Sequence, residues 1–419
     1  MRPFECDLLL RSAGDLAIPQ RHLCGHAVGE QHDIRCRGAS AVRRQWSQRQ
    51  WFASERCVGA RSVHPVAVDE LGLQRQTAEG ADGPDRTALR HGLPSVTSVL
   101  PETADVVIVG GGVMGASTAF HLAEAGVDVV LVERGDLAGG STSRAAGGVR
   151  ANFSDDLNIS LGLRSLELFE VFQQRPGQAI DLHRSGYLFV LTSPEEVATF
   201  ERTIALQNSL GVESRMVDAE EAVRLSPLLN PEGVLAAAWS PRDGHCAPES
   251  VVLGYATGAR RHGATVRTGV EVTGIDSIAG EITGVRTTAG SVRTGCVIDC
   301  AGAWSPQIAT YVGVDLPVTP YRRELIVTEP MPEPIDMAFT IEYGTSLYWH
   351  REGRGILTGF SDKTNPAGFD LDRDPEFPAK LAELAKFRAP ALLELGVQTG
   401  WTGLYEVTPD HNALLGEAR

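Results

Sequence analysis

Residues 105–115 read DVVIVGGGVMG, and this short stretch decides the fold of the chain. The β-branched run predicts a buried strand, and the three glycines predict a tight loop after it. Apolar residues then recur at helical spacing as far as Ala125, and Gly126 is a natural helix end. A second strand is expected at residues 127–132, directly before Glu133. The stretch therefore predicts a strand, loop, helix and strand of an α/β fold.

Each glycine of the G-x-G-x-x-G pattern has a mechanical role in binding a dinucleotide. Gly110 permits the tight turn, Gly112 lets the backbone approach a pyrophosphate, and Gly115 lets the helix pack against the sheet. The helix N-terminus offers N–H groups and partial positive charge to the phosphates. Glu133 follows Gly112 by 21 residues, where an acid holds the ribose hydroxyls and disfavours a 2′-phosphate. Chance glycines in an apolar core are the alternative explanation.

The residues after the second strand favour FAD over a nicotinamide cofactor. A nicotinamide enzyme continues with another helix and strand, whereas residues 135–150 read GDLAGGSTSRAAGGVR. Such a Gly/Ser loop offers amides and hydroxyls to a long, extended cofactor. The candidate cofactor ligands of this unit are Gly110, Gly111, Gly112, Val113, Met114, Gly115, Glu133, Arg134, Gly140, Ser141, Thr142, Ser143, Gly147 and Gly148.

Composition and charge exclude several classes of protein. Hydrophobic residues at 42% and charged residues at 22% of 419 are typical of a globular chain with more than one domain. The 38 basic and 53 acidic residues give a net charge of −15, which argues against nucleic acid as a partner. No apolar run in the N-terminal region suits a secretory signal or a membrane anchor, so we expect a cytoplasmic protein.

The first hundred residues differ in kind from the rest. Their 13 basic residues are all Arg and their 11 acids leave a charge of +2, whereas the remainder carries −17. They show no lasting periodicity, so we expect residues 1–101 to be a poorly ordered extension. An Arg-rich transit peptide and a translation start near residue 96 stay open as alternatives. Cys24, His26, His32 and Cys36 fit no common zinc-site spacing, so no metal is expected.

Several blocks of this sequence resemble a known family. Glu133-Arg134 with the Gly/Ser loop, residues 269–275 (GVEVTGI) and residues 297–305 (VIDCAGAWS) resemble the FAD-dependent amine oxidoreductases of the D-amino acid oxidase superfamily. Residues 348–353 (YWHREG) and 403–412 (GLYEVTPDHN) also fit this family. The nearest branch holds the sarcosine oxidase beta-subunit, glycine oxidase and proline dehydrogenase, and the resemblance spans residues 104–419.

The resemblance implies how FAD is held. Val272 would contact the adenine through its backbone, and Ala301, Gly302 and Trp304 would lie where the backbone meets the flavin. Neither the Cys nor the His that attaches flavin covalently in some relatives stands at the matching positions, so we expect noncovalent FAD. The family also has a glycine- and His-rich C-terminal segment that completes the substrate pocket. The sequence stops at Arg419 before it, so a fragment or an inactive protein is an alternative.

Pattern and resemblance together predict an α/β fold with a Rossmann-like FAD-binding domain and a second, mixed-sheet α+β substrate domain. The FAD-binding domain is expected at residues 102–184 and 244–316, the substrate domain at 185–243 and 317–409, and the start of a truncated C-terminal segment at 410–419. Helices are expected at residues 157–172, from 194, at 218–223 and at 248–262. Strands are expected at residues 186–191, 265–275, 282–287 and 291–301, and densely from 318 to 360.

Four residues are candidates for the substrate site. Arg150 matches in position an Arg that contacts the substrate carboxylate in relatives, and a guanidinium suits a carboxylate best. Arg323, beside Arg322, is the second candidate cation. Tyr348 and His350 lie one strand repeat apart and share a face, which we expect to look toward the flavin. Ordinary structural roles for these side chains are the alternatives.

These residues suit oxidation of a small amino acid or N-methyl amino acid, such as sarcosine. The expected reaction is hydride transfer from the carbon beside nitrogen to flavin N5, giving an imine that water hydrolyses. Oxygen or an electron carrier is the expected acceptor, and a hetero-oligomeric assembly stays open. Two other functions also stay open: a noncatalytic FAD-binding subunit, and a 2-hydroxy-acid or glycerol-phosphate dehydrogenase of the same fold.

Overall fold

A four-stranded parallel sheet forms around the glycine motif in the computed structural model, which describes residues 100–418. Its strands lie in the order β12 (Val297–Asp299), β1 (Val106–Val109), β2 (Val129–Val132) and β8 (Thr265–Arg267). Every residue of β1 and β2 is buried, as in a parallel sheet covered on both faces. The predicted strand, loop, helix and strand are confirmed. The predictions for the N-terminal extension lie outside the described residues.

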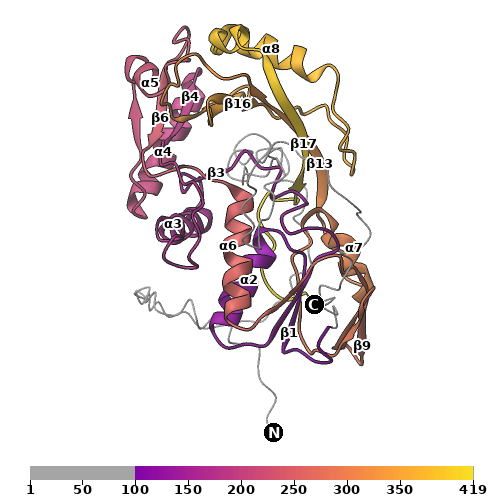
Figure 1. Ribbon diagram of the computed structural model, residues 1–419. Coiled ribbons are helices and arrows are strands. Elements are labelled where there is room, and N and C mark those ends of the chain that lie inside the picture. Colours follow the sequence, from indigo (N-terminus) through magenta and orange to yellow (C-terminus); the bar gives the residue numbers. More distant parts are fainter. Residues whose placement is uncertain (1–99, 419) are drawn as a thin grey trace, which may run out of the picture. The chain divides into compact units, whose positions relative to one another are not determined.

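Two helices cover one face of this sheet and a small antiparallel sheet covers the other. Helices α2 (Val113–Glu124) and α6 (Pro248–Arg261) lie side by side (Figure 1) and pack on the sheet through one apolar cluster. Strands β9 (Val272–Ile278), β10 (Glu281–Thr287) and β11 (Gly290–Val292) bury apolar side chains against the opposite face. Successive apolar residues of β1 and β2 point to opposite faces of the sheet, so that alternate residues pack against the helices and against the small antiparallel sheet.

The second main sheet is mixed, as predicted, and in the structure it has eight strands. In spatial order these are β17 (Val397–Val407), β13 (Thr319–Thr328), β16 (Gly355–Gly359), β15 (Tyr348–Glu352), β14 (Phe339–Glu342), β4 (Tyr187–Leu191), β6 (Ala236–Ser240) and β5 (Arg215–Val217). Only the β4 and β14 pair within this sheet is parallel. The strands of the parallel sheet lie within residues 102–184 and 244–316, and those of the mixed sheet lie within 185–243 and 317–409. The boundaries of the two domains stay a prediction.

Shorter elements connect the sheets. Strands β3 (Gly148–Val149) and β7 (Gly244–His245) form a two-stranded pair. The remaining α-helices are α3 (Asp156–Glu170), α4 (Pro194–Ser209), α5 (Ala219–Leu225), α7 (Ser305–Ala309) and α8 (Phe377–Arg388), with 3-10 turns η2 (Gly302–Trp304), η3 (Thr310–Val312) and η4 (Pro390–Glu394). Among the described residues, no helix combines the length and the apolar character that crossing a membrane requires.

Two predicted strands are each divided in the structure. Residues 265–275 form β8 and the beginning of β9, because Gly269 adopts a φ of 67° and turns the chain out of the parallel sheet. Residues 291–301 contain the end of β11 and all of β12. Between them the Thr294 hydroxyl accepts a hydrogen bond from the Cys296 N–H, which stabilises a turn. Helix α8 has no counterpart in the prediction.

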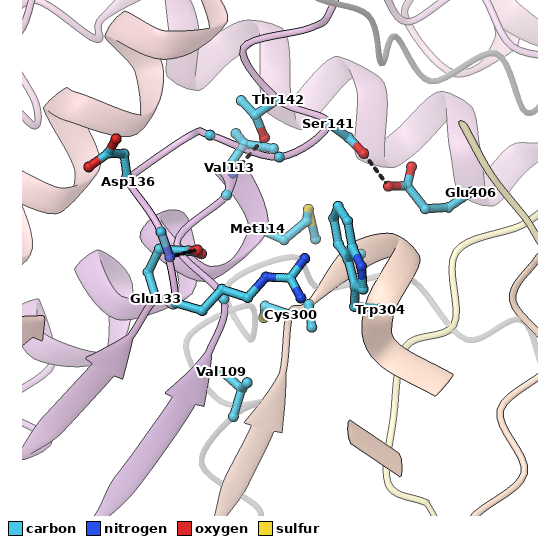
Figure 2. Close-up of a pocket in the computed structure, with 18 of the residues that line it drawn as sticks. Val109, Val113, Met114, Glu133, Asp136, Ser141, Thr142, Cys300, Trp304 and Glu406 are labelled. Atoms are coloured by element: carbon cyan, nitrogen blue, oxygen red, sulfur yellow. Dashed lines mark hydrogen bonds between the residues drawn. The ribbon is translucent and has the colours of Figure 1, made fainter. Parts of the chain in front are cut away.

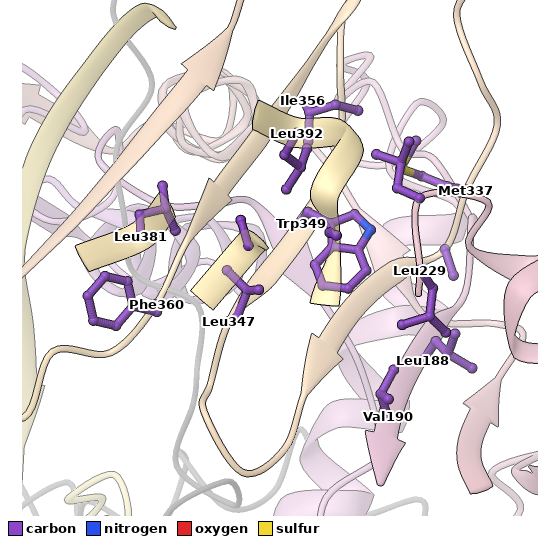
Figure 3. Packing of buried hydrophobic residues seen from close by; sticks show 14 of the residues in the cluster. Leu188, Val190, Leu229, Met337, Leu347, Trp349, Ile356, Phe360, Leu381 and Leu392 are labelled. Carbon is purple, nitrogen blue, oxygen red and sulfur yellow. The ribbon is translucent and has the colours of Figure 1, made fainter. Parts of the chain in front are cut away.

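The two faces of the mixed sheet have different neighbours. On the outer face, Trp349 belongs to one large apolar cluster with Leu381 of α8 and Leu392 of η4 (Figure 3). On the inner face, Tyr348 and Leu357 pack with Ala146, which follows the serines of the Gly/Ser loop. The strand repeat of two explains why consecutive residues of β15 belong to different layers.

A buried carboxyl group connects the inner layer to the Gly/Ser loop region. Asp243 is 1% exposed, and its Oδ1 accepts a hydrogen bond of 2.9 Å from the Ala151 N–H. Its main-chain oxygen accepts a hydrogen bond of 2.8 Å from the Gly186 N–H. Burial raises the pKa of Asp243 to about 7, although the Ala151 hydrogen bond and the charge of Arg150 lower it.

This raised pKa predicts a pH-dependent stability. The folded chain holds the Asp243 proton between about pH 4 and about pH 7 while the unfolded chain has lost it, so the free energy of unfolding falls as the pH rises through this window. The loss is on the order of 1 kcal/mol per pH unit. The Asp243→Asn variant keeps the acceptor oxygen without the charge, so its stability should fall less between pH 5 and pH 8.

Urea unfolding at four pH values in this interval measures the effect. Asp336→Asn is the matched control, because the Asp336 side chain is 98% exposed. An Asp243→Asn protein whose stability follows the same pH profile as the wild type would contradict the prediction.

Candidate functional site

A cavity of about 580 Å³ lies where β1, β2 and β12 end (Figure 2). This volume is in the range of small-molecule sites, and the carboxyl ends of parallel strands are where open α/β sheets bind ligands. The residues predicted to hold the cofactor all line this cavity except Gly111, Gly115 and Ser143. The cavity therefore brings together the predicted segments: the glycine motif, the Gly/Ser loop, Val272 and the turn at Ala301.

Two of the glycines are required by close backbone contacts. A Cβ on Gly110, whose φ is 108°, would lie 2.4 Å from the Cys300 main-chain oxygen. A Cβ on Gly115 would lie 1.9 Å from the Gly110 oxygen. Gly112 is different, because the nearest atom to its Cβ position is the Thr142 hydroxyl oxygen at 3.2 Å. Gly110 and Gly115 allow the sheet and the helix to pack closely, whereas Gly112 keeps the cavity wall thin.

The carboxylate of Glu133 lies at the end of β2 beside the glycine loop. Its Oε2 accepts a hydrogen bond of 2.7 Å from the Gly111 N–H, and its Oε1 accepts one of 2.8 Å from the Gly135 N–H. These bonds place the acid where a ribose would meet the loop. The guanidinium of Arg134 lies 4.3 Å from the centre of the Trp304 ring, so this pair covers another part of the cavity wall.

Glu406 is a cavity residue that sequence reasoning missed. The Ser141 hydroxyl donates a hydrogen bond of 2.6 Å to Glu406 Oε1 (Figure 2). Burial raises the pKa of Glu406, while the hydrogen bond from Ser141 lowers it. The residue stands inside the block at 403–412 on which the family resemblance rests, yet nothing in that block indicates which loop the carboxylate meets.

The four candidate substrate residues lie outside the lining of this cavity. Arg150 is 6% exposed, and its guanidinium donates hydrogen bonds to the main-chain oxygen and Oδ1 of Asn152 at 3.3 and 3.1 Å. The same guanidinium lies 4.3 Å from the centre of the Phe153 ring. Arg150 is thus packed among the aromatic side chains next to the loop that it follows.

The other arginine candidate lies on β13. Arg323 has the strand parity of Leu325, which packs on the inner face with Ala146. Its guanidinium lies 5.4 Å from the ring centre of Tyr405 and 5.9 Å from that of Tyr321. Arg322 has the opposite parity and forms an ion pair of 2.7 Å with Asp370.

Tyr348 and His350 both meet the Gly/Ser loop at Ala146. Tyr348 packs beside Ala146, and His350 Nε2 lies 3.0 Å from the Ala146 main-chain oxygen. His350 Nδ1 lies 2.8 Å from the Arg351 main-chain oxygen. Ligand atoms of His350, His245 and Glu352 come within 4.8 Å of one another. Since both nitrogens of His350 already face carbonyl oxygens, we assign no metal to this cluster.

The residues of the cavity fit the predicted FAD. Gly112 leaves room for a pyrophosphate at the N-terminus of α2, and the Glu133 carboxylate suits the ribose hydroxyls. The extended wall of glycines and hydroxyls from residues 139–148 suits the length of the cofactor. Residues 139–148 contain neither cysteine nor histidine, and noncovalent binding stays a prediction.

Comparisons with known proteins agree with this assignment. Rat (Rattus norvegicus) mitochondrial dimethylglycine dehydrogenase is 33% identical over 69% of this chain and 34% of its own length. Sarcosine oxidase subunit beta of Rhodobacter capsulatus is 26% identical over 75% of this chain and 77% of its own length. The crystal structure of L-proline dehydrogenase from P. horikoshii has a TM-score of 0.73 at 32% identity, covering 76% of this chain and 86% of that one.

The chain spans about a third of the length of the rat relative. The model of the DAO family, described as FAD dependent oxidoreductase, matches residues 105–419. That match covers the glycine motif, the whole cavity and both main sheets. The chain therefore belongs to the FAD dependent oxidoreductase (DAO) family.

Proposed function

We propose that this chain oxidises the C–N bond of a small amino acid or an N-methyl amino acid. The observation that carries the proposal is the inner face of the mixed sheet. Tyr348 on this face packs beside Ala146 of the Gly/Ser loop, and Arg323 lies on the same face of its strand as Leu325, which packs in the same cluster. The relatives support the same chemistry, since they are named for dimethylglycine, sarcosine and proline.

The chain's own residues would share the work as follows. Bound FAD supplies a hydride acceptor at N5. Arg323 binds the substrate carboxylate, and the apolar side chains of Leu325 and Leu357 exclude water beside it. His350 holds the Ala146 carbonyl, so its role is to fix the loop rather than to receive the amine proton. This leaves Tyr348 as the side chain that favours the unprotonated amine.

Arg150 keeps a second, structural place in the proposal. Its hydrogen bonds to Asn152 and its stacking on Phe153 hold the chain directly after the Gly/Ser loop. Its charge lies near Asp243, whose carboxyl group binds the next main-chain N–H. We propose that Arg150 acts on the substrate carboxylate only through the position of this loop.

The partners are part of the proposal as well. Because the Rhodobacter relative is a subunit by name, we propose that this chain assembles with a different chain. The electron acceptor is oxygen or a carrier. A cytoplasmic location also belongs to the proposal, and the rat relative is described as mitochondrial.

The first experiment tests the reaction. Purified protein loaded with FAD should lose the yellow absorbance of oxidised flavin when sarcosine, dimethylglycine, glycine or proline is added without oxygen. Bleaching by 2-hydroxy acids or glycerol phosphate but not by amines would select the alternative dehydrogenase. Protein that binds FAD and is bleached by neither group of compounds would support the noncatalytic alternative.

The second experiment tests the ribose contact. In Glu133→Gln one acceptor oxygen becomes an NH₂ group and the charge disappears, so FAD affinity should fall by about 10-fold to 100-fold. Titration of the apoprotein with FAD, followed by flavin fluorescence, measures the dissociation constant. Glu220→Gln is the control, because the Glu220 side chain is 85% exposed and belongs to α5. Equal FAD affinity in the Glu133→Gln variant and the wild type would contradict the assignment.

The third experiment tests the substrate cation. Arg323→Met keeps the length of the side chain and removes its charge, so the KM for an amino-acid substrate should rise about 100-fold. Arg322→Met is the neighbouring control, because Arg322 pairs with Asp370 on the other face. Its KM should stay within about twofold of the wild type. If the Arg322 variant shows the larger rise, the carboxylate site has been placed on the wrong face.

A further inference from the structure

The ring of Trp304 is part of the cavity wall and has neighbours from three segments of the chain. Trp304 lies in η2, and its ring points toward the Gly/Ser loop (Figure 2). A Cβ on Gly140 would lie 3.5 Å from Trp304 Cζ3, and the Arg134 guanidinium lies 4.3 Å from the ring centre. The third neighbour is Phe369, whose ring centre lies 5.6 Å from that of Trp304 with the ring planes at 30°. Phe369 itself does not line the cavity, so its contact with the wall runs through Trp304.

Phe369 belongs to the segment between β16 and α8, and the backbone before it is fixed to the mixed sheet. The Gly368 N–H donates a hydrogen bond of 2.9 Å to the Pro320 main-chain oxygen in β13. Ala367 forms an isolated antiparallel bridge with Tyr321 of the same strand. The two residues directly before Phe369 are therefore both held by β13. The mixed sheet thus presents the Phe369 ring to Trp304 from a fixed backbone.

The exposure of Phe369 indicates that its ring is not a core side chain. It is 43% exposed and belongs to none of the apolar clusters formed by the described residues. Burial in a core therefore does not explain this side chain, whereas its contact with Trp304 has the geometry of a favourable aromatic pair. Such a pair changes an equilibrium constant by about twofold to tenfold. Phe369 thus stabilises one position of the Trp304 ring.

The position of the Trp304 ring matters for a cofactor that we expect to be bound noncovalently. Trp304 is half-buried and Arg134 is exposed, so a core holds neither of them. Phe369 adds a neighbour that is anchored to the second sheet. Without Phe369 the Trp304 ring would leave the cavity wall more often, and a bound cofactor would dissociate faster. Most differences in affinity between related complexes lie in the dissociation rate, so this rate is the quantity to measure.

We propose that Phe369 is a positioning residue that braces Trp304 in the wall of the cofactor cavity and thereby slows the release of FAD. The inference goes beyond the proposed function, since it concerns the cofactor and holds for any substrate. It gives the mixed sheet a task that is separate from substrate binding, because a segment that connects two of its elements supports the wall of the cofactor cavity.

The variant Phe369→Ala removes the ring that contacts Trp304. Its rate of FAD release should rise about fivefold, while the association rate should stay within about twofold of the wild type. Exchange of bound FAD for an excess of radiolabelled FAD, with no substrate present, measures the release rate. Stopped-flow quenching of flavin fluorescence by the apoprotein measures association. Phe369→Tyr keeps an aromatic ring, so its release rate should stay within about twofold of the wild type.

A double-mutant cycle tests whether Phe369 acts through Trp304. Trp304→Ala removes the residue that Phe369 contacts, so adding Phe369→Ala to it should change the release rate by less than about twofold. Phe387→Ala is the matched control, because Phe387 is 49% exposed and lies on α8, and it should release FAD at the wild-type rate. The apoproteins of the two alanine variants should have similar melting temperatures, which separates a local effect from a loss of stability.

The outcomes separate this inference from the proposed function. Equal release rates in Phe369→Ala and the wild type overturn it, and so does an equal rise in association and release, because Phe369 would then obstruct the entrance instead of bracing the wall. An undiminished effect in the Trp304→Ala background also overturns it. Phe369→Leu, which keeps an apolar side chain without the ring, gives the same comparison where the alanine variant folds poorly. Faster release that depends on Trp304 supports the inference even when no amine bleaches the flavin, in which case the proposed function falls alone.

Discussion

The close contact between the backbone at Gly110 and the backbone at Cys300 is the contact on which the cavity depends. The oxygen of Cys300, directly after β12, lies 2.4 Å from the position of a Cβ on Gly110, and the Gly110 oxygen lies 1.9 Å from that of a Cβ on Gly115. Any side chain at either position would push β12 or α2 away from β1. The turn at Ala301, which follows β12, would then lose its place in the cavity wall. Because Gly110 and Gly115 have no side chains, β1, α2 and the turn after β12 can pack closely enough to form the cavity wall.

A second constraint comes from the strand repeat of the mixed sheet. Since consecutive residues face opposite layers, the core beneath α8 and the proposed substrate side are built from alternate residues of the same strands. Trp349 fills the outer core, while Tyr348 and His350 meet the loop at Ala146. A shift of one residue in the register would exchange the two sets. The stability of the outer cluster therefore also fixes which side chains reach the cofactor side.

The glycine motif and the family blocks predicted most of the cofactor cavity because their geometry is local. The distances from Gly112 to Glu133 and to the Gly/Ser loop are set by one helix and two strands. The breaks between β8 and β9 at Gly269 and between β11 and β12 at Thr294 were missed. A run of β-branched residues predicts a strand but does not indicate where the chain leaves one sheet for another. Glu406 was missed because its role depends on a contact with a loop far earlier in the sequence, the Ser141 contact spanning 265 positions.

The contact between Ser141 and Glu406 joins the two main sheets at the cavity. Ser141 belongs to the loop that follows the parallel sheet, and Glu406 belongs to β17 at the edge of the mixed sheet. Gly403, the register partner of Arg323, lies on the same strand. The contact of the Glu406 carboxylate with the Gly/Ser loop thus helps to position β17, the strand that pairs with β13. Because β17 takes part in both contacts, the cofactor cavity and the proposed substrate face are positioned together rather than independently.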